Sequence, residues 1–177
     1  ARKVAGFSTG ETRLSSSERR LRGRLNKMGP DMMKTHVQES WAVIEKDIKP
    51  HGIKFFLRIF EIAPGALQLF SFKDVKDLAS SPELATHACQ VMNTVGKAVA
   101  GLSDLQKLIP VLKTLGAAHA KYSVKPEHFP IVGAALLWML EEDLTPMGLW
   151  TPDVKEAWTK TWETVVSVME PALTAAA

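Results

Sequence analysis

Cysteine is almost absent from this chain of 177 residues, which contains only Cys89. One thiol cannot form a disulfide within the chain, and it cannot supply the pair of thiols that redox motifs and thiol-rich metal sites require. The simplest role for Cys89 is that of a small core or surface residue. Protein classes that depend on internal disulfides or on two-thiol motifs are therefore excluded.

Long hydrophobic runs are also missing. No stretch of 18 or more apolar residues occurs, and no charged start leads into an apolar stretch with a small-residue cleavage site. We therefore expect a cytoplasmic protein with neither a membrane span nor a secretory signal. Hydrophobic residues nevertheless make up 46% of the chain, which is enough to bury one substantial core but not two.

Positive charge is concentrated at the start of the chain. Residues 1–30 carry eight of the 22 Lys and Arg residues and two of the 19 Asp and Glu residues, a net charge of +6, which leaves −3 for the remainder. Few large apolar groups accompany these charges, so we expect residues 1–30 to form a mostly disordered extension. It is either a solvated tail or an electrostatic arm for an anionic membrane, a nucleic acid or another partner, although no specific nucleic acid is predicted.

Prolines followed by an acid mark four helix starts, at residues 29–31, 81–83, 125–127 and 151–153. Proline suits the first helical position because its missing N–H would be unpaired there, and the acid favours the positive end of the helix dipole. Ser81 and Thr151 can also act as N-caps.

Long periodic segments follow these starts, and Pro130 predicts that one of them either begins at about Glu127 or kinks at this proline. Two shorter helical segments begin near Lys49 and Ile109, and residues 63–70 form a brief turn between helices. Strand-like alternation of useful length and internal repeats are absent. The predicted fold class is all-α.

A histidine lies on the apolar face of each of two predicted helices. The first apolar stripe consists of Leu84, His87, Ala88, Val91, Val95, Ala98, Val99 and Leu102. The second consists of Leu105, Leu108, Leu112, Leu115 and His119, although Pro110 suggests that the regular helix starts only around Ile109. One inward histidine is usually a satisfied core residue. Two on different helices point to a shared ligand, because burial favours the neutral imidazole that binds metals.

Haem fits between two such stripes better than zinc does. A zinc site needs three or four His, Cys or carboxylate ligands, and the stripes supply no others. Haem iron needs only one or two axial ligands, together with a slot of aliphatic and aromatic side chains. The lone cysteine excludes covalent attachment through C-x-x-C-H. The available aromatic residues, many of which also suit ordinary core packing, are Phe55, Phe56, Phe60, Phe70 and Phe72.

Several sequence landmarks occur together in a characteristic order. They are "SW" at 40–41, "HGIKFFLRIF" at 51–60, Pro64 six residues before Phe70, "SSPELATHACQVM" at 80–92, "LGAAHA" at 115–120, "FPIVGAALLWMLE" at 129–141 and "AWTKTWETVVSVM" at 157–169. His87 and His119 stand 32 residues apart. With these landmarks, residues 31–173 resemble the globin family, most closely its neuroglobin and globin X branches.

The resemblance implies a globin fold for residues 31–177, with helices packed around a haem b pocket, and an N-terminal extension at 1–30. It makes His119 the proximal iron ligand and His87 the distal histidine and second metal ligand. The other cofactor-binding residues that it implies are Phe56 of the second helix, Phe70 against the porphyrin, Phe72, Val91 one turn beyond His87, Val124 and Phe129.

The chain also departs from these branches. Cys89 alone cannot form the disulfide that vertebrate neuroglobin can close near its distal helix, and Phe72 stands where neuroglobin has a tyrosine. Globin X has an extended N terminus with lipid-anchoring signals, but the extension here lacks the Met-Gly start that myristoylation needs. We therefore expect any peripheral contact with a membrane to go through the basic tail.

His87 has two roles under this resemblance. It either donates a hydrogen bond to a bound gas or binds the iron itself, giving six-coordinate haem that must open before a gas can enter. The neuroglobin-like pattern favours the second role. The expected function is reversible binding of O₂, CO or NO in sensing, redox chemistry or scavenging.

Other functions stay open from the sequence. One is a five-coordinate oxygen carrier or store, and another is a helical interaction module without a cofactor. A third is nitrite reduction or NO dioxygenation with electrons from an external reductase, because the chain has no G-x-G-x-x-G motif for a nucleotide cofactor of its own.

Deleting residues 1–28 tests the expected independence of the extension. Since this segment has few apolar groups to contribute to a core, haem content and melting temperature should stay nearly unchanged. Thermal unfolding of the full chain and the truncated chain, followed by circular dichroism, makes the comparison. A fall of more than about 5 °C in melting temperature would show that the extension packs on the domain.

Overall fold

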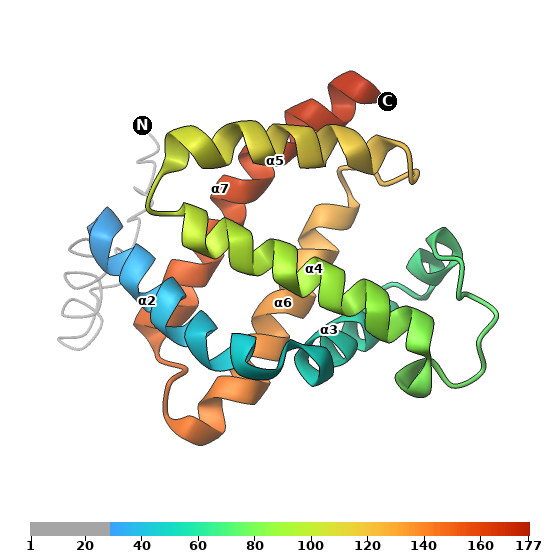
Figure 1. Cartoon of the computed structure of the whole chain (residues 1–177), viewed down its shortest axis with the longest axis horizontal. Coiled ribbons are helices and arrows are strands. Elements are labelled where there is room, and N and C mark those ends of the chain that lie inside the picture. Colours follow the sequence, from blue (N-terminus) through green and yellow to red (C-terminus); the bar gives the residue numbers. More distant parts are fainter. Residues whose placement is uncertain (1–28) are drawn as a thin grey trace, which may run out of the picture.

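A computed structural model describes residues 29–177, and most of the expected extension lies outside the described residues (Figure 1). The long helices are α2 (Pro30–Ile44), α3 (Ile48–Ile62), α4 (Pro82–Gly101), α5 (Leu105–Ala120), α6 (His128–Leu144) and α7 (Pro152–Ala176). Short 3₁₀ helices join them: η1 (Glu45–Asp47), η2 (Pro64–Leu69), η3 (Leu78–Ser80) and η4 (Thr145–Met147). Because residues 29–177 contain no strand, the all-α prediction is confirmed for them.

Proline starts three of the four helices for which the sequence predicts it, and the prediction is wrong for the fourth, because Pro126 lies before α6, which begins at His128. Pro30, Pro82 and Pro152 are the first residues of α2, α4 and α7. The hydroxyl of Ser81 accepts a hydrogen bond from the backbone N–H of Leu84 at 3.1 Å, which caps α4. Thr151 caps α7 in the same way through the N–H of Val154, at 3.2 Å.

The sequence predicts the start of α6 to within one residue but misplaces the start of α5. The start of α6 at His128 lies one residue beyond the expected Glu127, so Pro130 falls in the first turn, where its missing N–H costs nothing. The expected start of α5 near Ile109 is wrong, because the helix begins at Leu105.

Asp104 explains the earlier start of α5. Its carboxylate accepts a hydrogen bond from the N–H of Lys107 at 3.3 Å and so caps the helix. Pro110 then lies inside α5 and removes one intrahelical hydrogen bond, which the helix tolerates near its beginning. Leu105, expected on the buried stripe, is 50% exposed because it is the first residue of the helix.

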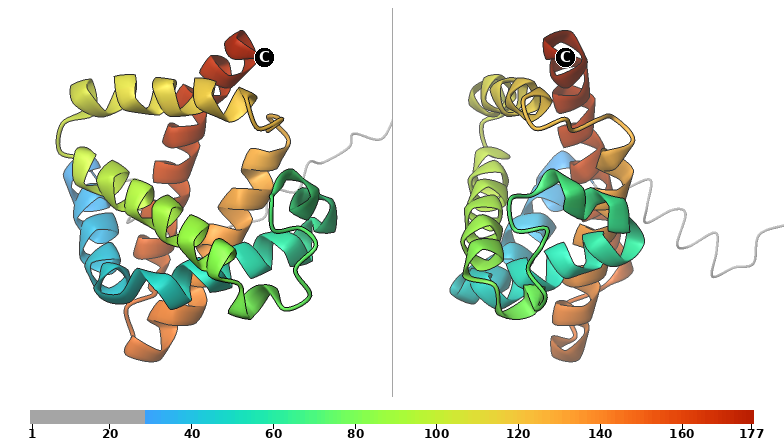
Figure 2. Two further views of the ribbon diagram at one scale, coloured as in Figure 1. Left: turned by 45° about the vertical axis from the view of Figure 1, so that its right-hand side comes forward. Right: turned by 90° about the vertical axis from the view of Figure 1, so that its right-hand side faces the viewer.

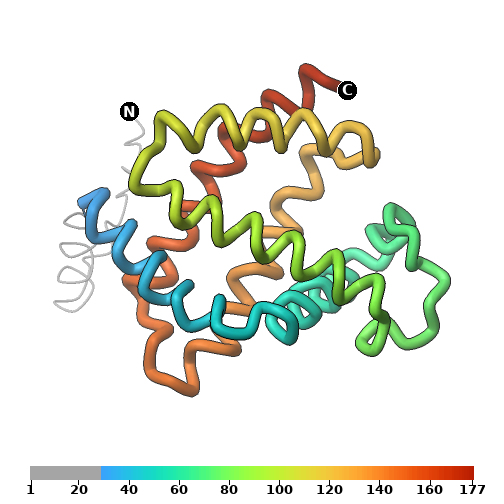
Figure 3. Tube along the Cα trace, viewed as in Figure 1, coloured from blue at the N-terminus to red at the C-terminus, as the bar shows by residue number. Residues whose placement is uncertain are grey.

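The six long helices cross one another in two groups that share α7. In the first group, α3 packs against α4 and α6, and α2 packs against the N-terminal half of α7 (Figure 2). In the second group, α5 packs on the C-terminal half of α7. The trace in Figure 3 shows α4 turning directly into α5, after which the two helices diverge along their lengths.

Two hydrophobic clusters match these groups. The larger cluster joins α2, α3, α4, α6 and the first half of α7, and it includes Trp41 and Trp158, whose ring centroids are 5.9 Å apart. The indole N–H of Trp158 donates to the hydroxyl of Ser40 at 2.9 Å. The smaller cluster consists of Leu108, Leu112, Phe129, Met169 and Leu173. Within residues 29–177, no helix is both long and apolar enough to cross a lipid bilayer.

Two glycines let the backbones of neighbouring helices approach closely. A Cβ at Gly116 of α5 would lie 2.3 Å from the carbonyl oxygen and 2.9 Å from the Cα of Met169 in α7. A Cβ at Gly52 of α3 would lie 3.1 Å from the Cβ of Ala88 in α4 and 2.9 Å from the Cγ of Met92. The positions of α4 and α5 therefore depend on these contacts, and each of the two helices carries one of the predicted histidines.

Replacing Gly116 by alanine should lower the free energy of unfolding by about 1–3 kcal/mol, because the clash is with backbone atoms that cannot rotate away. The roughly 1 kcal/mol that alanine gains over glycine in helix propensity is already subtracted from this loss, since a contact of 2.3 Å with a backbone oxygen is a severe clash. Urea unfolding of the purified variant measures the change. Gly65→Ala is the matched control, since nothing lies within 4 Å of its added Cβ, and the idea fails if both variants unfold at the same urea concentration.

Candidate functional site

His119 lies in the last turn of α5, and both its side chain and its backbone are held by hydrogen bonds. Its Nδ1 lies 2.7 Å from the carbonyl oxygen of Leu115. A carbonyl oxygen can only accept, so Nδ1 carries the hydrogen and the lone pair of Nε2 is left free. The side chain is thus held in the tautomer that can bind a metal through Nε2.

The end of α5 fixes the backbone of His119. Ser123 adopts a left-handed conformation with φ of 58°, and the N–H of Val124 donates back to the carbonyl of His119 at 3.4 Å. The N–H of Ser123 donates to the carbonyl of Ala120 at 3.2 Å. These two bonds form a Schellman motif, which ends the helix and fixes Val124 relative to His119.

His87 lies in the second turn of α4, and its ring is half-buried. The capping hydroxyl of Ser81 and the first residue Pro82 fix the start of the helix, and the contact of Ala88 with Gly52 holds the helix on α3. The neighbouring Ala88 and the more distant Met92 are fully buried, whereas Val91 is half-buried. One side of the predicted stripe therefore packs on α3, and the side with His87 and Val91 is left more accessible.

Burial lowers the pKa of His87 below its ordinary value, and the electrostatic interaction with the His119 imidazole lowers this pKa further. The two imidazoles are thus close enough to interact electrostatically although they belong to different helices. Because its protonated form is disfavoured, His87 is neutral at pH 7, and a neutral imidazole has a lone pair for a metal.

Three phenylalanine rings surround the His87 ring. The centroid distances from His87 are 5.1 Å to Phe56, 5.3 Å to Phe70 and 6.2 Å to Phe72. The rings of Phe56 and Phe70 meet the imidazole edge-on, with interplanar angles of 66° and 71°. The structure therefore brings together three of the predicted pocket residues around the predicted distal histidine.

The other predicted pocket residues belong to both hydrophobic clusters. Val91 packs against the larger cluster. Phe129 is a buried member of the smaller one, and Val124 packs against that cluster. The predicted residues thus form one group around His87, drawn from α3, α4 and the connection between η2 and η3, whereas Val124 follows α5 and Phe129 lies in α6. The two histidines themselves lie on α4 and α5, which diverge from the turn between them (Figure 2).

Half-buried apolar side chains continue both groups. Val91 and Val95 follow His87 along α4, and Leu115 precedes His119 by one turn of α5. Val111, one further turn back along α5, is 58% exposed although it is apolar. The protein covers these side chains only in part. Partly exposed apolar side chains on α4 and α5 suit contact with a large flat apolar group.

The donor set fits haem and not a polydentate metal site. Within residues 29–177, no group of three or more His, Cys, Asp or Glu side chains is arranged to hold a metal ion. The two imidazoles, one from α4 and one from α5, supply at most two axial ligands, which is the number that a haem iron takes from a protein.

An open pocket of about 610 Å³ adjoins the His87 ring. Sequence reasoning found three of its lining residues, His87, Phe70 and Phe72, and missed the others, which are Leu69, Ser71, Pro82, Glu83, Thr86, Gln90 and Tyr122. The spacing from His87 could have indicated Gln90 and Glu83, which lie three and four residues away on the same side of α4. Nothing in the sequence links Tyr122 to His87, since it comes from the turn after α5.

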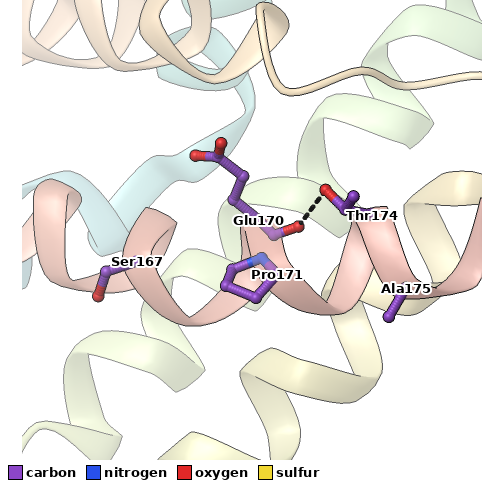
Figure 4. Close-up of a pocket in the computed structure, with 5 residues that line it drawn as sticks. All are labelled: Ser167, Glu170, Pro171, Thr174 and Ala175. Carbon is purple, nitrogen blue, oxygen red and sulfur yellow. Dashed lines mark hydrogen bonds between the residues drawn. The ribbon is translucent and has the colours of Figure 1, made fainter.

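A second open hollow, of about 490 Å³, lies along the exposed end of α7. Its lining residues all belong to that helix and are Ser167, Glu170, Pro171, Thr174 and Ala175 (Figure 4). The dashed line marks the hydrogen bond from the hydroxyl of Thr174 to the carbonyl of Glu170, 3.0 Å long. The hollow contains none of the predicted site residues, so it has no part in the histidine site.

Comparisons with known proteins agree with this arrangement. The globin family model matches residues 53–169. Neuroglobin of Danio rerio is 37% identical over 137 residues, which cover 75% of this chain and 85% of the relative. Neuroglobin of Tetraodon nigroviridis is 36% identical over the same length, with the same coverage. The resemblance to globins, and to neuroglobin among them, is confirmed. With its all-helical fold, the chain belongs to the globin family.

Proposed function

We propose that this globin binds haem b through Nε2 of His119, that His87 competes for the sixth coordination position, and that the protein reversibly binds O₂, CO or NO. The observation that carries the proposal is the pair of half-buried imidazoles on α4 and α5, each followed or preceded by incompletely packed apolar side chains. Membership of the globin family supports the choice of haem as the group between them.

His119 is prepared for its role before any ligand arrives. The hydrogen bond from its Nδ1 to the carbonyl of Leu115 restrains the ring and leaves Nε2 free to bind a metal. The Schellman motif at Ser123 holds the backbone of the same residue. A ligand nitrogen held in this way loses little freedom when it binds iron, so more of the binding free energy is retained.

Haem, when bound, supplies an iron that takes up a diatomic gas and exchanges electrons. The half-buried apolar side chains of Val91 and Val95 on α4, of Leu115 on α5 and of Val124 just after α5 would exclude water from its faces. Phe56 and Phe70 would close the distal side, where they already contact His87. Exclusion of water strengthens every polar interaction within such a pocket.

His87 would act as an internal competitor of the gas. Its neutral ring keeps a lone pair for the iron, and its pKa is lowered by burial and by His119. A gas then binds only while the ring is displaced, and the apparent affinity is the intrinsic affinity multiplied by the open fraction. A position open for about 1% of the time would make binding appear roughly 100-fold weaker. Two states that a ligand can shift suit sensing or redox chemistry better than oxygen storage.

Replacing His119 by alanine should release haem or leave it loosely held, because the ligand nitrogen is lost while the apolar walls remain. Transfer of haem to an excess of a haem-scavenging apoprotein, followed by absorbance, measures the dissociation rate. His36→Ala is the control, since it removes a half-buried imidazole from α2. Tight retention of haem with an unchanged spectrum in the His119 variant would exclude this residue as the ligand.

Replacing His87 by leucine should convert the ferrous spectrum from the sharp split bands of six-coordinate haem to the single broad band of five-coordinate haem. It should also raise the rate of CO binding, because the competitor is gone and CO needs little help from a hydrogen-bond donor. O₂ affinity need not rise with it, since the same change removes a donor. Stopped-flow mixing with CO measures the rate, and a variant that matches the parent in spectrum and rate contradicts the competition.

A further inference from the structure

The ring of His87 lies in a cage made by the rings of Phe56, Phe70 and Phe72, which is called the aromatic cage below. Phe56 comes from α3, His87 comes from α4, and Phe70 and Phe72 come from the connection between η2 and η3. Three segments of the chain therefore meet at one imidazole. Edge-to-face contacts of this kind place the positive edge of one ring against the negative face of another.

The aromatic cage is itself well packed. The rings of Phe70 and Phe72 are stacked, with centroids 5.1 Å apart and an interplanar angle of 24°. Phe56 meets Phe70 edge-on at 5.8 Å. Phe60 supports the cage from behind, at 6.1 Å from Phe56, 5.4 Å from Phe70 and 6.5 Å from Phe72. Of these four rings, only those of the cage contact His87 in the part of the chain that the structure describes.

The aromatic cage adjoins the open pocket of about 610 Å³. His87, Phe70 and Phe72 line this pocket together with Tyr122, which is 67% exposed. The imidazole thus rests against the phenylalanines on one side and borders an opening to solvent on the other. A ring in this place is sheltered from water although the pocket beside it is open.

A histidine that leaves iron needs another stable position. In water the ring would regain its hydration but lose its apolar contacts, whereas in the aromatic cage it keeps three ring contacts. Aromatic pairs contribute beyond the area that they bury, so the cage stabilises the displaced ring. The open fraction of the sixth position depends on the free-energy difference between the two ring positions.

We propose that the aromatic cage is the resting place of the displaced His87 ring, and that Phe72, which stacks on Phe70, is a positioning residue that sets the open fraction of the sixth coordination position. This inference rests on the proposed function, because it assigns a second place to the ring that competes for iron. The displaced ring leaves the gas a free position and borders the pocket through which solvent reaches the site.

Phe72→Leu tests the role of the cage. Loss of one ring should destabilise the displaced position, lower the open fraction and slow CO binding about two- to tenfold. Ile44→Ala is the control, since it truncates a fully buried side chain of α2 in the same hydrophobic cluster that belongs neither to the cage nor to the ring behind it, and its CO rate should stay within about twofold of the parent's. Phe72→Tyr keeps the ring and should restore the parent's rate.

The same substitution in a His87→Leu background separates positioning from a direct effect. If Phe72 acts through His87, the CO rate of His87→Leu should be unchanged by the added Phe72→Leu. An equal slowing in both backgrounds would overturn the proposal, because Phe72 would then act on the gas or on haem. A faster rate in Phe72→Leu alone would also overturn it, since the ring would then obstruct entry.

Nuclear Overhauser spectra of the unaltered CO complex give a test that needs no substitution. CO occupies the sixth position, so the His87 ring must be displaced, and its protons should show contacts with the ring protons of Phe70 and Phe72. If these contacts are absent from the CO complex while the ferrous protein without CO is six-coordinate, the role of the cage is rejected and the proposed competition stands. A five-coordinate ferrous spectrum without CO would instead reject the proposed competition, so the two failures are distinguishable.

Discussion

The close approach of α5 to α7 at Gly116 is the contact on which the site depends. Because no side chain separates the two backbones at this point, α5 lies directly on α7, and His119 follows three residues later in the same helix. In the same way, the contact of Gly52 with Ala88 places α4, and with it His87, directly on α3. The helix that carries His119 thus packs on α7, and the helix that carries His87 packs on α3. The apolar sides that carry the histidines stay incompletely packed for this reason, and a flat apolar cofactor would complete them.

Two kinds of control over the imidazoles follow from their different surroundings. His119 is restrained by polar groups: its Nδ1 donates to the carbonyl of Leu115, and its own carbonyl accepts from Val124. Such bonds have strict distance and angle requirements, so they hold the ring in one orientation. His87 is surrounded by phenylalanine rings, whose contacts are weaker and less directional. The His119 ring is therefore suited to act as a permanent ligand, and the His87 ring is suited to act as a ligand that binds and dissociates.

Features that depend on neighbours along the chain could be read from the sequence. The proline starts of α2, α4 and α7 were predicted correctly, because a missing N–H and a capping hydroxyl act within one turn. The start of α5 is an exception, because the carboxylate cap of Asp104 begins the helix five residues before Pro110. A proline inside a helix costs one hydrogen bond, and packing against α7 can offset that cost.

Periodicity and spacing are local properties, so they already predict the all-helical class, the two histidines on apolar stripes and the aromatic residues near the second helix. Which part of each stripe is packed and which is left open depends instead on how the helices cross. Met92 is fully buried against α3, whereas His87 and Val91 on the same helix are half-buried, a division set by the approach at Gly52. The gathering of Phe56, Phe70 and Phe72 around His87, and of Tyr122 at the same pocket, likewise required the structure. The physical reason is that helix crossing depends on contacts between residues far apart in the chain, and these contacts leave no periodic signal in the sequence.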